Sequence, residues 1–318
     1  MKVYDSHDIK NIALLGNDGS GKTTLTEALL YESGRIKRRG RITMKNTVSD
    51  YFPVEQDYGY SVFSTIFHVE RNNKKLNIID CPGSDDFVGA AITALNVTDT
   101  AILLINGQYG PEVGTQNHFR YTDKLQKPVI FLVNQLDSEL CDYNNIVEQL
   151  QGIYGSKAIP VQYPVKTGPD FNSLIDVILM KKLTWGEEGG QPTIEDIPAE
   201  EKERAQEMHK ALFCVCAYKN MGVGRLMEFL GNVVPFVDEM PAVHNTRGEE
   251  VLLDPKGPTS VYFFKTGVEP HIGEVQYFKV MSGTLKEGDE LTNADRGTKE
   301  RIAQIFTCAG AQRDKVEK

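Results

Sequence analysis

The chain has 318 residues, more than most single hydrophobic cores contain, which predicts two domains. Its net charge is −9, from 35 basic and 44 acidic residues, so it is not a general DNA-coating protein. No apolar run is long enough to cross a bilayer, and the polar start from Met1 to Lys10 lacks the apolar core of a secretory signal. The 5 cysteines are an odd, sparse set, typical of free thiols in a reducing cytoplasm.

Apolar runs and helical periodicities alternate along most of the chain. They predict strands at 9–15, 62–70, 74–80, 100–106, 128–134 and 211–217, and helices at 23–33, 111–126, 142–154 and 222–233. Continuous apolar runs such as Ala-Ile-Leu-Leu-Ile at 101–105 are typical of strands covered on both faces. We therefore expect an α/β domain with a mainly parallel sheet and helices on both faces.

The remaining segments are set apart by their composition. Residues 187–207 hold eight acidic and two basic residues, and they predict an exposed insert, at about 140–210, with one charged helix. The stretch 235–258 is polar and proline-rich, which indicates a linker, and short strands with glycine turns follow Thr259. We expect a first domain at 1–240, a linker at 241–257 and a partial antiparallel β-barrel at 258–318.

The strongest motif follows the first predicted strand. It reads Gly16-Asn17-Asp18-Gly19-Ser20-Gly21-Lys22-Thr23 and matches the phosphate-binding loop pattern G-x-x-x-x-G-K-[ST]. Glycines let successive backbone N–H groups face one anion, Lys22 adds positive charge at the β- and γ-phosphates, and the Thr23 hydroxyl ligates Mg²⁺. The motif lies between a predicted strand and a predicted helix, so we expect a P-loop nucleotide-binding domain.

Two further motifs end apolar strands. In Asp80-Cys81-Pro82-Gly83, the aspartate can hold Mg²⁺ through water and the glycine N–H can contact a γ-phosphate. In Asn134-Gln135-Leu136-Asp137, the last carboxylate can accept two hydrogen bonds from guanine that adenine does not offer. Each motif is weak alone, but the ordered series of three predicts a site for GTP and GDP.

These motifs, in this order, resemble those of the translational GTPases. Residues 11–36, 77–116 and 218–236 are similar to the GTP-binding domain of elongation factor G, and residues 269–291 to the start of its second domain. The resemblance covers the chain from about residue 9 to its end, and it indicates a divergent second form of elongation factor G. The later domains of the family lie outside this sequence, so we do not expect the chain alone to be a complete translocase.

The resemblance assigns roles to individual residues. Gly16 to Thr24 would bind phosphates and Mg²⁺; Asn134, Gln135 and Asp137 would hold guanine; and Cys216-Ala217-Tyr218 would lie behind the base. The stretch 34–61 would be the first switch loop, whose family signature R-G-I-T reads Tyr58-Gly59-Tyr60-Ser61 here. Ser61 would therefore replace the threonine that ligates Mg²⁺, together with Thr23 and, through water, Asp80.

Several departures from the family pattern concern hydrolysis. The family's D-T-P-G-H reads Asp80-Cys81-Pro82-Gly83-Ser84, so Ser84 replaces the histidine that orients the attacking water. In the phosphate loop, Asp18 replaces an isoleucine and Gly19 an aspartate, and Gln135 replaces the lysine of N-K-x-D. Nucleotide binding is expected to survive these changes, and GTP hydrolysis is expected to be slow.

Several functions are open at this point. The first is a ribosome-directed elongation factor acting in tRNA and mRNA translocation with impaired hydrolysis, and a ribosome-protection or peptide-release GTPase is a close relative of it. A nucleotide-gated ribosome-binding module with little turnover is the alternative from another class. A P-loop kinase would need an acceptor site that the sequence does not offer. We expect a cytoplasmic monomer whose partner is the ribosome rather than a membrane or DNA.

One basic run lies inside the expected switch loop. Six positive residues fall within eleven positions that hold no acid: Arg35, Lys37, Arg38, Arg39, Arg41 and Lys45. The run is equally typical of a solvated, mobile loop and of a patch that contacts phosphate.

Overall fold

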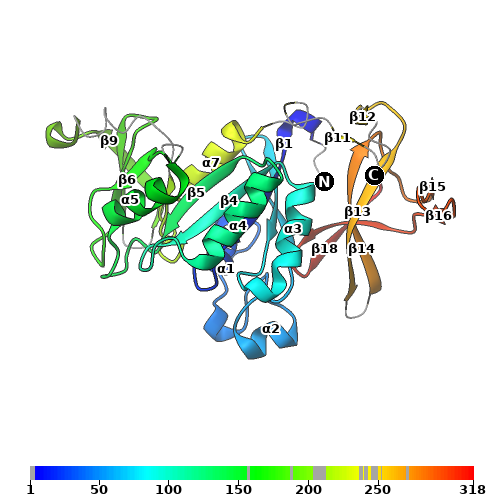
Figure 1. The fold of residues 1–318 in the computed structure, drawn as a ribbon, viewed down its shortest axis with the longest axis horizontal. Coiled ribbons are helices and arrows are strands. Elements are labelled where there is room, and N and C mark those ends of the chain that lie inside the picture. Colours follow the sequence, from blue (N-terminus) through cyan, green and yellow to red (C-terminus); the bar gives the residue numbers. More distant parts are fainter. Residues whose placement is uncertain are drawn as a thin grey trace.

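The computed structural model describes residues 4–155, 158–186, 189–202, 213–235, 239, 243–244, 250–251, 253–269 and 272–318. Its centre is a six-stranded sheet in the order β10-β5-β4-β1-β3-β2 (Figure 1). The strands are β1 Ile9–Gly16, β2 Thr65–Arg71, β3 Lys74–Asp80, β4 Thr100–Asn106, β5 Val129–Asn134 and β10 Phe213–Cys214. All neighbours are parallel except β2, which runs antiparallel to β3. This mixed sheet confirms the predicted fold class.

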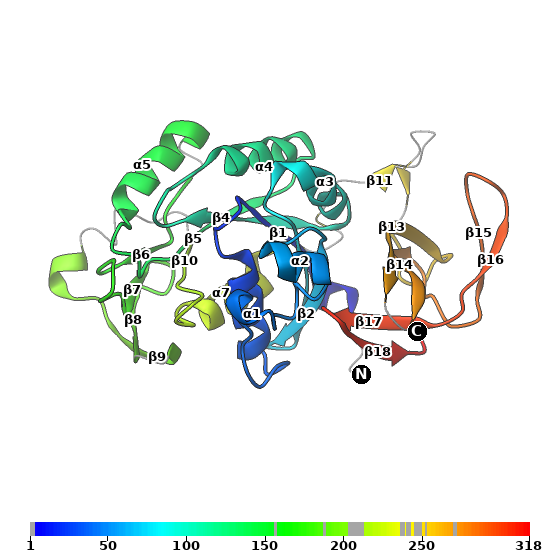
Figure 2. The ribbon, with the colours of Figure 1, turned by 90° about the horizontal axis from the view of Figure 1, so that it is seen from below.

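Helices cover both faces of the sheet, as Figure 2 shows most clearly. They are α1 Lys22–Glu32, α3 Val88–Val97, α4 Val113–Lys124, α5 Tyr143–Tyr154 and α7 Val223–Val233. Alternate residues of β1 enter two cores: Ala13 and Leu15 pack on the side of α3, α4 and α5, and Ile12 and Leu14 on the side of α1 and α7. The parallel strands read as continuous apolar runs because both of their faces are buried.

Two helices and a second sheet were not predicted. The missed helices are α3 and the short α2 Pro53–Tyr58. The insert holds a four-stranded antiparallel sheet of β6 Gln162–Pro164, β7 Ser173–Asp176, β8 Lys181–Gly186 and β9 Gly189–Asp196. Residues 189–196 of the charged segment thus form a strand, and 203–207 lies outside the described residues, so the expected charged helix stays a prediction there.

Cross-strand pairing explains why the acidic segment forms a strand. Lys181 lies opposite Asp196 with their charged atoms 2.6 Å apart, and Lys182 lies opposite Glu195 at 3.6 Å. Opposite charges on facing strands stabilise a sheet, whereas charge counting along the sequence cannot show which strand will face the segment.

The shorter elements connect this framework. They are the 3-10 turns η1 Ser6–Asp8, η2 Ile42–Met44, η3 Asp85–Phe87 and η5 Ala199–Glu201, and the bridge of β11 Val243–His244 with β12 Glu250–Val251. None of the helices in the described ranges is long and apolar enough to cross a membrane.

Antiparallel hairpins follow, as predicted. They are formed by β13 Ser260–Glu269, β14 Gly273–Ser282, β15 Glu290–Thr292, β16 Lys299–Arg301, β17 Ile305–Ala309 and β18 Gln312–Val316. The turn of the last hairpin reaches the central sheet, where the Gly310 N–H donates to the Ile66 carbonyl at 3.0 Å.

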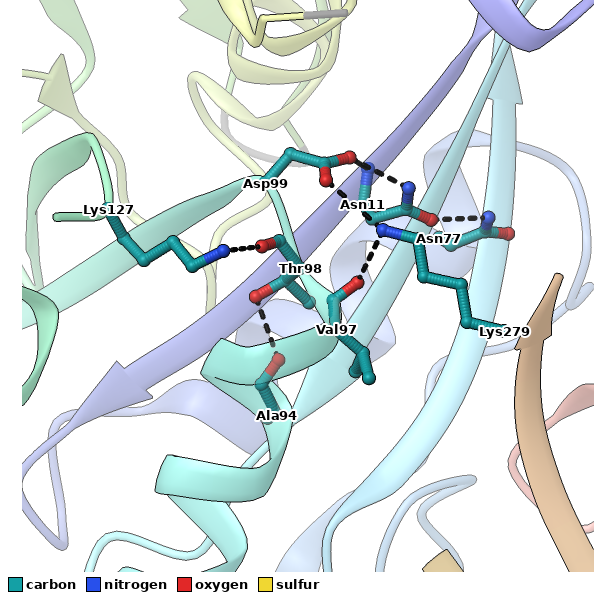
Figure 3. A network of polar contacts seen from close by, with 8 residues as sticks. All are labelled: Asn11, Asn77, Ala94, Val97, Thr98, Asp99, Lys127 and Lys279. Carbon is teal, nitrogen blue, oxygen red and sulfur yellow. Dashed lines mark hydrogen bonds and ion pairs between the residues drawn. The ribbon is translucent and has the colours of Figure 1, made fainter. Parts of the chain in front are cut away.

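A polar network also joins β14 to the amino-terminal edge of the central sheet (Figure 3). Lys279 Nζ donates to the Val97 carbonyl at 3.0 Å and lies 3.3 Å from Asp99 Oδ1. Asp99 Oδ2 accepts from Asn11 Nδ2 at 2.7 Å, and Asn11 Oδ1 accepts from Asn77 at 3.0 Å. Lys279 of the hairpin β13–β14 is thus bound to the residues just before β4, where β1, β3 and β4 lie side by side.

Candidate functional site

The predicted motifs meet at the opposite, carboxyl-terminal edge of the central sheet. They follow β1, β3, β5 and β10, and loops that follow parallel strands share one edge of a sheet. Asn134 joins two of them, since its Nδ2 donates to the Ser20 carbonyl at 2.9 Å and its Oδ1 accepts from the Ala217 N–H at 3.0 Å. Gln135 Nε2 donates to the Gly19 carbonyl at 2.9 Å.

The phosphate loop surrounds the Lys22 side chain. Lys22 is buried, and its Nζ donates to the carbonyls of Gly16 and Asn17 at 2.8 and 2.9 Å. Burial lowers the pKa of Lys22, and the nearby Asp80 carboxylate opposes that shift. Gly21 has a φ of 91°, which favours glycine, and it places the start of α1 behind the loop.

The loop after β3 presses against the phosphate loop. A Cβ on Gly83 would lie 2.5 Å from Lys22 Nζ and 2.6 Å from the Asp18 nitrogen, so no larger residue fits. Cys81 and Pro82 are buried beneath it. Asp80 is buried too: its Oδ2 accepts from Thr26 Oγ1 at 2.8 Å, and its Oδ1 has no partner among the described residues.

Oxygen donors suited to Mg²⁺ lie together beside this carboxylate. The hydroxyls of Thr23 and Ser61 are 3.4 Å apart, and Ser61 donates to Asp50 Oδ1 at 2.7 Å. Asp50 is 5% exposed, and its Oδ2 is a second carboxylate oxygen that lacks a partner within the described ranges. Mg²⁺ prefers such hard oxygen ligands and keeps waters or substrate phosphates for the rest of its shell. The residues present therefore fit this cation.

Burial governs the protonation of both carboxylates. It raises the pKa of Asp80 to about 7, with Lys22 opposing the shift, and it also raises the pKa of Asp50. Asp50 had no signal in the sequence, because it lies eleven positions before Ser61 in a loop without regular spacing. The described residues contain no group of three or more His, Cys, Asp or Glu placed to hold a metal ion, so the hydroxyls are essential to this interpretation.

A cavity of about 400 Å³ opens beside the phosphate loop. It is lined by Gly21, Thr24, Asn134, Gln135, Asp137, Ser138 and Tyr218. Leu136, Cys216 and Ala217 are buried and do not line it. Burial raises the pKa of the Cys216 thiol to about 12, with the Asp137 charge as the second cause. The cavity therefore has one carboxylate in its wall and an aromatic ring at its rim.

Buried carboxylates hold the 34–61 loop. Glu27, on α1, accepts from the Gly40 N–H at 2.6 Å and the Val48 N–H at 2.5 Å. Glu55, inside the loop, accepts from the N–H groups of Val62 and Phe63, both at 3.0 Å. Burial raises the pKa of both glutamates. Neither was predicted from the sequence, because nothing local separates a glutamate that binds a distant loop from a solvated one.

Ser84 and Asp18 lie at the rim of the site. Ser84 is the N-cap of η3, and its hydroxyl accepts from the Asp86 N–H at 3.3 Å. Asp18 is exposed, and its Oδ1 accepts from the Gly19 N–H at 3.0 Å. Each side-chain oxygen thus accepts a hydrogen bond from a backbone N–H one or two residues further along the chain.

Comparisons with known proteins agree with this geometry. The family described as Elongation factor Tu GTP binding domain matches residues 7–236, and Elongation factor G domain 2 matches residues 258–318. Elongation factor G of Thermotoga maritima is 30% identical over 99% of this chain and 53% of its own length. An elongation factor G-like protein of the same organism is 26% identical over 98% of this chain and 50% of its own length.

A solved structure gives the same relationship in three dimensions. A crystal structure of a protein from Thermus thermophilus superposes with a TM-score of 0.85 at 26% identity, covering 98% of this chain and 51% of that one. The chain thus spans about half the length of each of these three relatives. One family match covers the α/β part of the chain, and the other covers the hairpins that follow it. The chain therefore belongs to the translational GTPases of the elongation factor G type.

Proposed function

We propose that the chain binds GTP and GDP with Mg²⁺ and is the nucleotide-dependent part of a factor that acts on the ribosome in tRNA and mRNA translocation. The main observation behind this proposal is the position of Asn134. This residue ends β5 and forms hydrogen bonds to both the phosphate loop and the loop after β10, so three predicted motifs meet there. A cytoplasmic location and a monomeric state are part of the proposal, and the family membership supports them.

Each part of the nucleotide has a counterpart in the site. The buried Lys22 and the backbone N–H groups of its loop would meet the phosphates. Thr23 and Ser61 would ligate Mg²⁺, with Asp80 and Asp50 holding its waters. The Asp137 carboxylate in the cavity wall would accept the two donors of guanine and so exclude ATP. When bound, Mg²⁺ would offset the phosphate charge.

Hydrolysis is proposed to be slow. Transfer of the γ-phosphoryl group to water needs a group that places the water and meets the developing charge. The Ser84 hydroxyl accepts a hydrogen bond from its own turn, and Asp18 adds negative charge beside the phosphate loop. Loss of one such positioning group typically costs about 10²–10³ in rate.

Turnover measurements test this part of the proposal. We expect the chain to hydrolyse GTP far more slowly, with or without ribosomes, than the matching span of Thermotoga maritima elongation factor G. Ser84→His alone should recover little, because Asp18 and Gly19 remain. The triple change Ser84→His, Asp18→Ile, Gly19→Asp should recover more. Equal rates for the two wild-type proteins would show that Ser84 is a tolerated substitution.

The second candidate is a nucleotide-gated ribosome-binding module, or a ribosome-protection factor, with little turnover. The same three substitutions favour it, since binding needs the phosphate loop but not a placed water. In either case GTP with Mg²⁺ should protect the 34–61 loop from proteolysis and GDP should not. Equal cleavage with both nucleotides would contradict a switch.

A further inference from the structure

The basic run of the 34–61 loop makes a contact that its composition does not predict. Arg39 Nη1 donates to the carbonyls of Ala217 and Tyr218 at 3.0 and 2.9 Å. Its guanidinium also lies 5.7 Å from the centre of the Tyr31 ring on α1. One arginine of the switch loop is therefore bound to the loop that follows β10.

A second anchor holds the neighbouring residue. The Gly40 N–H donates to Glu27 at 2.6 Å, and Glu27 also accepts from the Val48 N–H. A Cβ on Gly40 would lie 2.3 Å from the Asn46 carbonyl, so the segment between the two bonds is closely folded. Because Glu27 is in the helix that begins at Lys22, the residue next to Arg39 is bound to the helix that follows the phosphate loop.

The loop that Arg39 holds forms part of the base cavity. Tyr218 lines that cavity together with Asp137, and the Ala217 N–H is bound to Asn134. The Arg41 guanidinium lies 5.9 Å from the centre of the Tyr218 ring, on the side of the switch loop. A shift of Arg39 would therefore remove two of the hydrogen bonds that hold the loop carrying Tyr218.

We propose that Arg39 is a positioning residue that couples the switch loop to the base cavity. Ordering of the loop by GTP and Mg²⁺ then holds the Tyr218 wall of the cavity closed and slows release of the triphosphate. The diphosphate lacks the γ-phosphate that would hold the Ser61 end of the loop through Mg²⁺, so the Arg39 contact is made less of the time and release of the diphosphate depends little on it. Such coupling is reciprocal, and an occupied base cavity also favours the ordered loop. The inference rests on the proposed function, because it requires a guanine nucleotide in this cavity.

Dissociation rates test the coupling with a matched control. Arg38 has the same charge one position earlier, is exposed, and makes no hydrogen bond with the described residues. With Mg²⁺, Arg39→Ala should speed dissociation of a fluorescent non-hydrolysable GTP analogue by about tenfold, the size expected for loss of a charged hydrogen bond. Labelled GDP should dissociate within about twofold of wild type from both variants, and Arg38→Ala should leave both rates unchanged.

Other outcomes decide between failure of the coupling and failure of the proposed function. If Arg39→Ala matches Arg38→Ala with both nucleotides, or speeds both nucleotides equally, the coupling is wrong while guanine binding stands. If the wild-type chain binds neither nucleotide, the proposed function itself fails. Arg39→Lys retains a donor at that position and should restore part of the effect, whereas a general loss of structure would appear as a lower unfolding temperature.

A measurement without nucleotide tests the contact itself. Thermolysin cleaves beside apolar residues such as Ile42, Met44 and Val48 and does not recognise arginine, so the variants retain the same cleavage sites. Arg39→Ala should be cut in this segment several times faster than wild type, and Arg38→Ala at the wild-type rate. Equal cleavage of all three proteins would contradict the anchoring role of Arg39.

Discussion

The two edges of the central sheet differ in how their buried carboxylates are satisfied. At the amino-terminal edge, both Asp99 oxygens are used, by Lys279 and Asn11, and Lys127 donates to the Thr98 carbonyl at 2.8 Å (Figure 3). At the carboxyl-terminal edge, Asp50 and Asp80 each keep one buried oxygen without a partner among the described residues. The buried carboxylate of the amino-terminal edge is fully paired, although the nearby Thr100 hydroxyl has no partner among the described residues, whereas each buried carboxylate of the other edge keeps an oxygen available to a ligand.

This difference has an energetic meaning. A buried polar atom without a partner destabilises the folded chain, and the cost is recovered only when a ligand supplies the partner. Residues of the carboxyl-terminal edge should therefore affect binding more than stability, and residues of the amino-terminal edge the reverse. The predictions below test that division.

The largest effect is expected at Lys22. Lys22→Met keeps the stem but removes the charge that would meet the phosphates, and it should cost about 3–5 kcal/mol of GTP and GDP affinity. Stability of the free chain should change little or rise, because burial lowers the pKa of Lys22 and so disfavours its charged form. Calorimetry measures the affinity and urea unfolding the stability. Nucleotide affinity retained in Lys22→Met would contradict the phosphate-loop assignment.

A smaller effect of the opposite kind is expected at Asp99. This residue is 4% exposed, and Asp99→Ala would leave Asn11 Nδ2 without its acceptor and Lys279 with the Val97 carbonyl but no carboxylate partner. We expect a loss of about 3 kcal/mol in the free energy of unfolding, with nucleotide affinity unchanged. Asp123→Ala, at an exposed position of α4, is the control and should be nearly neutral. A change in nucleotide affinity as large as the change in stability would break the division between the edges.

The smallest effect is a pH dependence of stability, caused by a buried histidine of β2 between the switch loop and β17. His68 is 3% exposed; its Nε2 lies 2.7 Å from Arg35 of the switch loop and its Nδ1 3.2 Å from the Cys308 carbonyl of β17. Burial, then the Arg35 charge, lowers the pKa of His68 to about 4. The unfolded chain takes up this proton first, so stability is full above the ordinary histidine pKa and is lost as pH falls from about 6.5 toward 4.

The variant His68→Gln isolates this effect. Between pH 7.5 and pH 5, the free energy of unfolding of His68→Gln should fall by about 2 kcal/mol less than that of the wild type. Urea unfolding at the two pH values measures the difference, and an unchanged pH dependence in His68→Gln would contradict the lowered pKa.

The sequence predicted most of the central sheet because its strands are continuous apolar runs ending in motifs of known chemistry. β3 and β4 have the predicted bounds, and β1 differs by one residue. The charged strand β9 could not be predicted, because its partner lysines come from β8. Asp50, Glu27 and Arg39 could not be predicted either, since each acts across a distance in the chain that no local spacing records.

The most direct test of the account is a calorimetric titration of the wild-type chain and Asp137→Asn with GTP, GDP and ATP, each with and without Mg²⁺. We predict that GTP and GDP bind the wild type in a one-to-one ratio, that Mg²⁺ strengthens GTP binding, and that ATP does not compete. Asp137→Asn should lose roughly 1.5–3 kcal/mol with both guanine nucleotides, the size of a charged hydrogen bond. Binding of ATP on equal terms with GTP, or no binding of either, would contradict the proposal that the carboxyl-terminal edge is a guanine-nucleotide site.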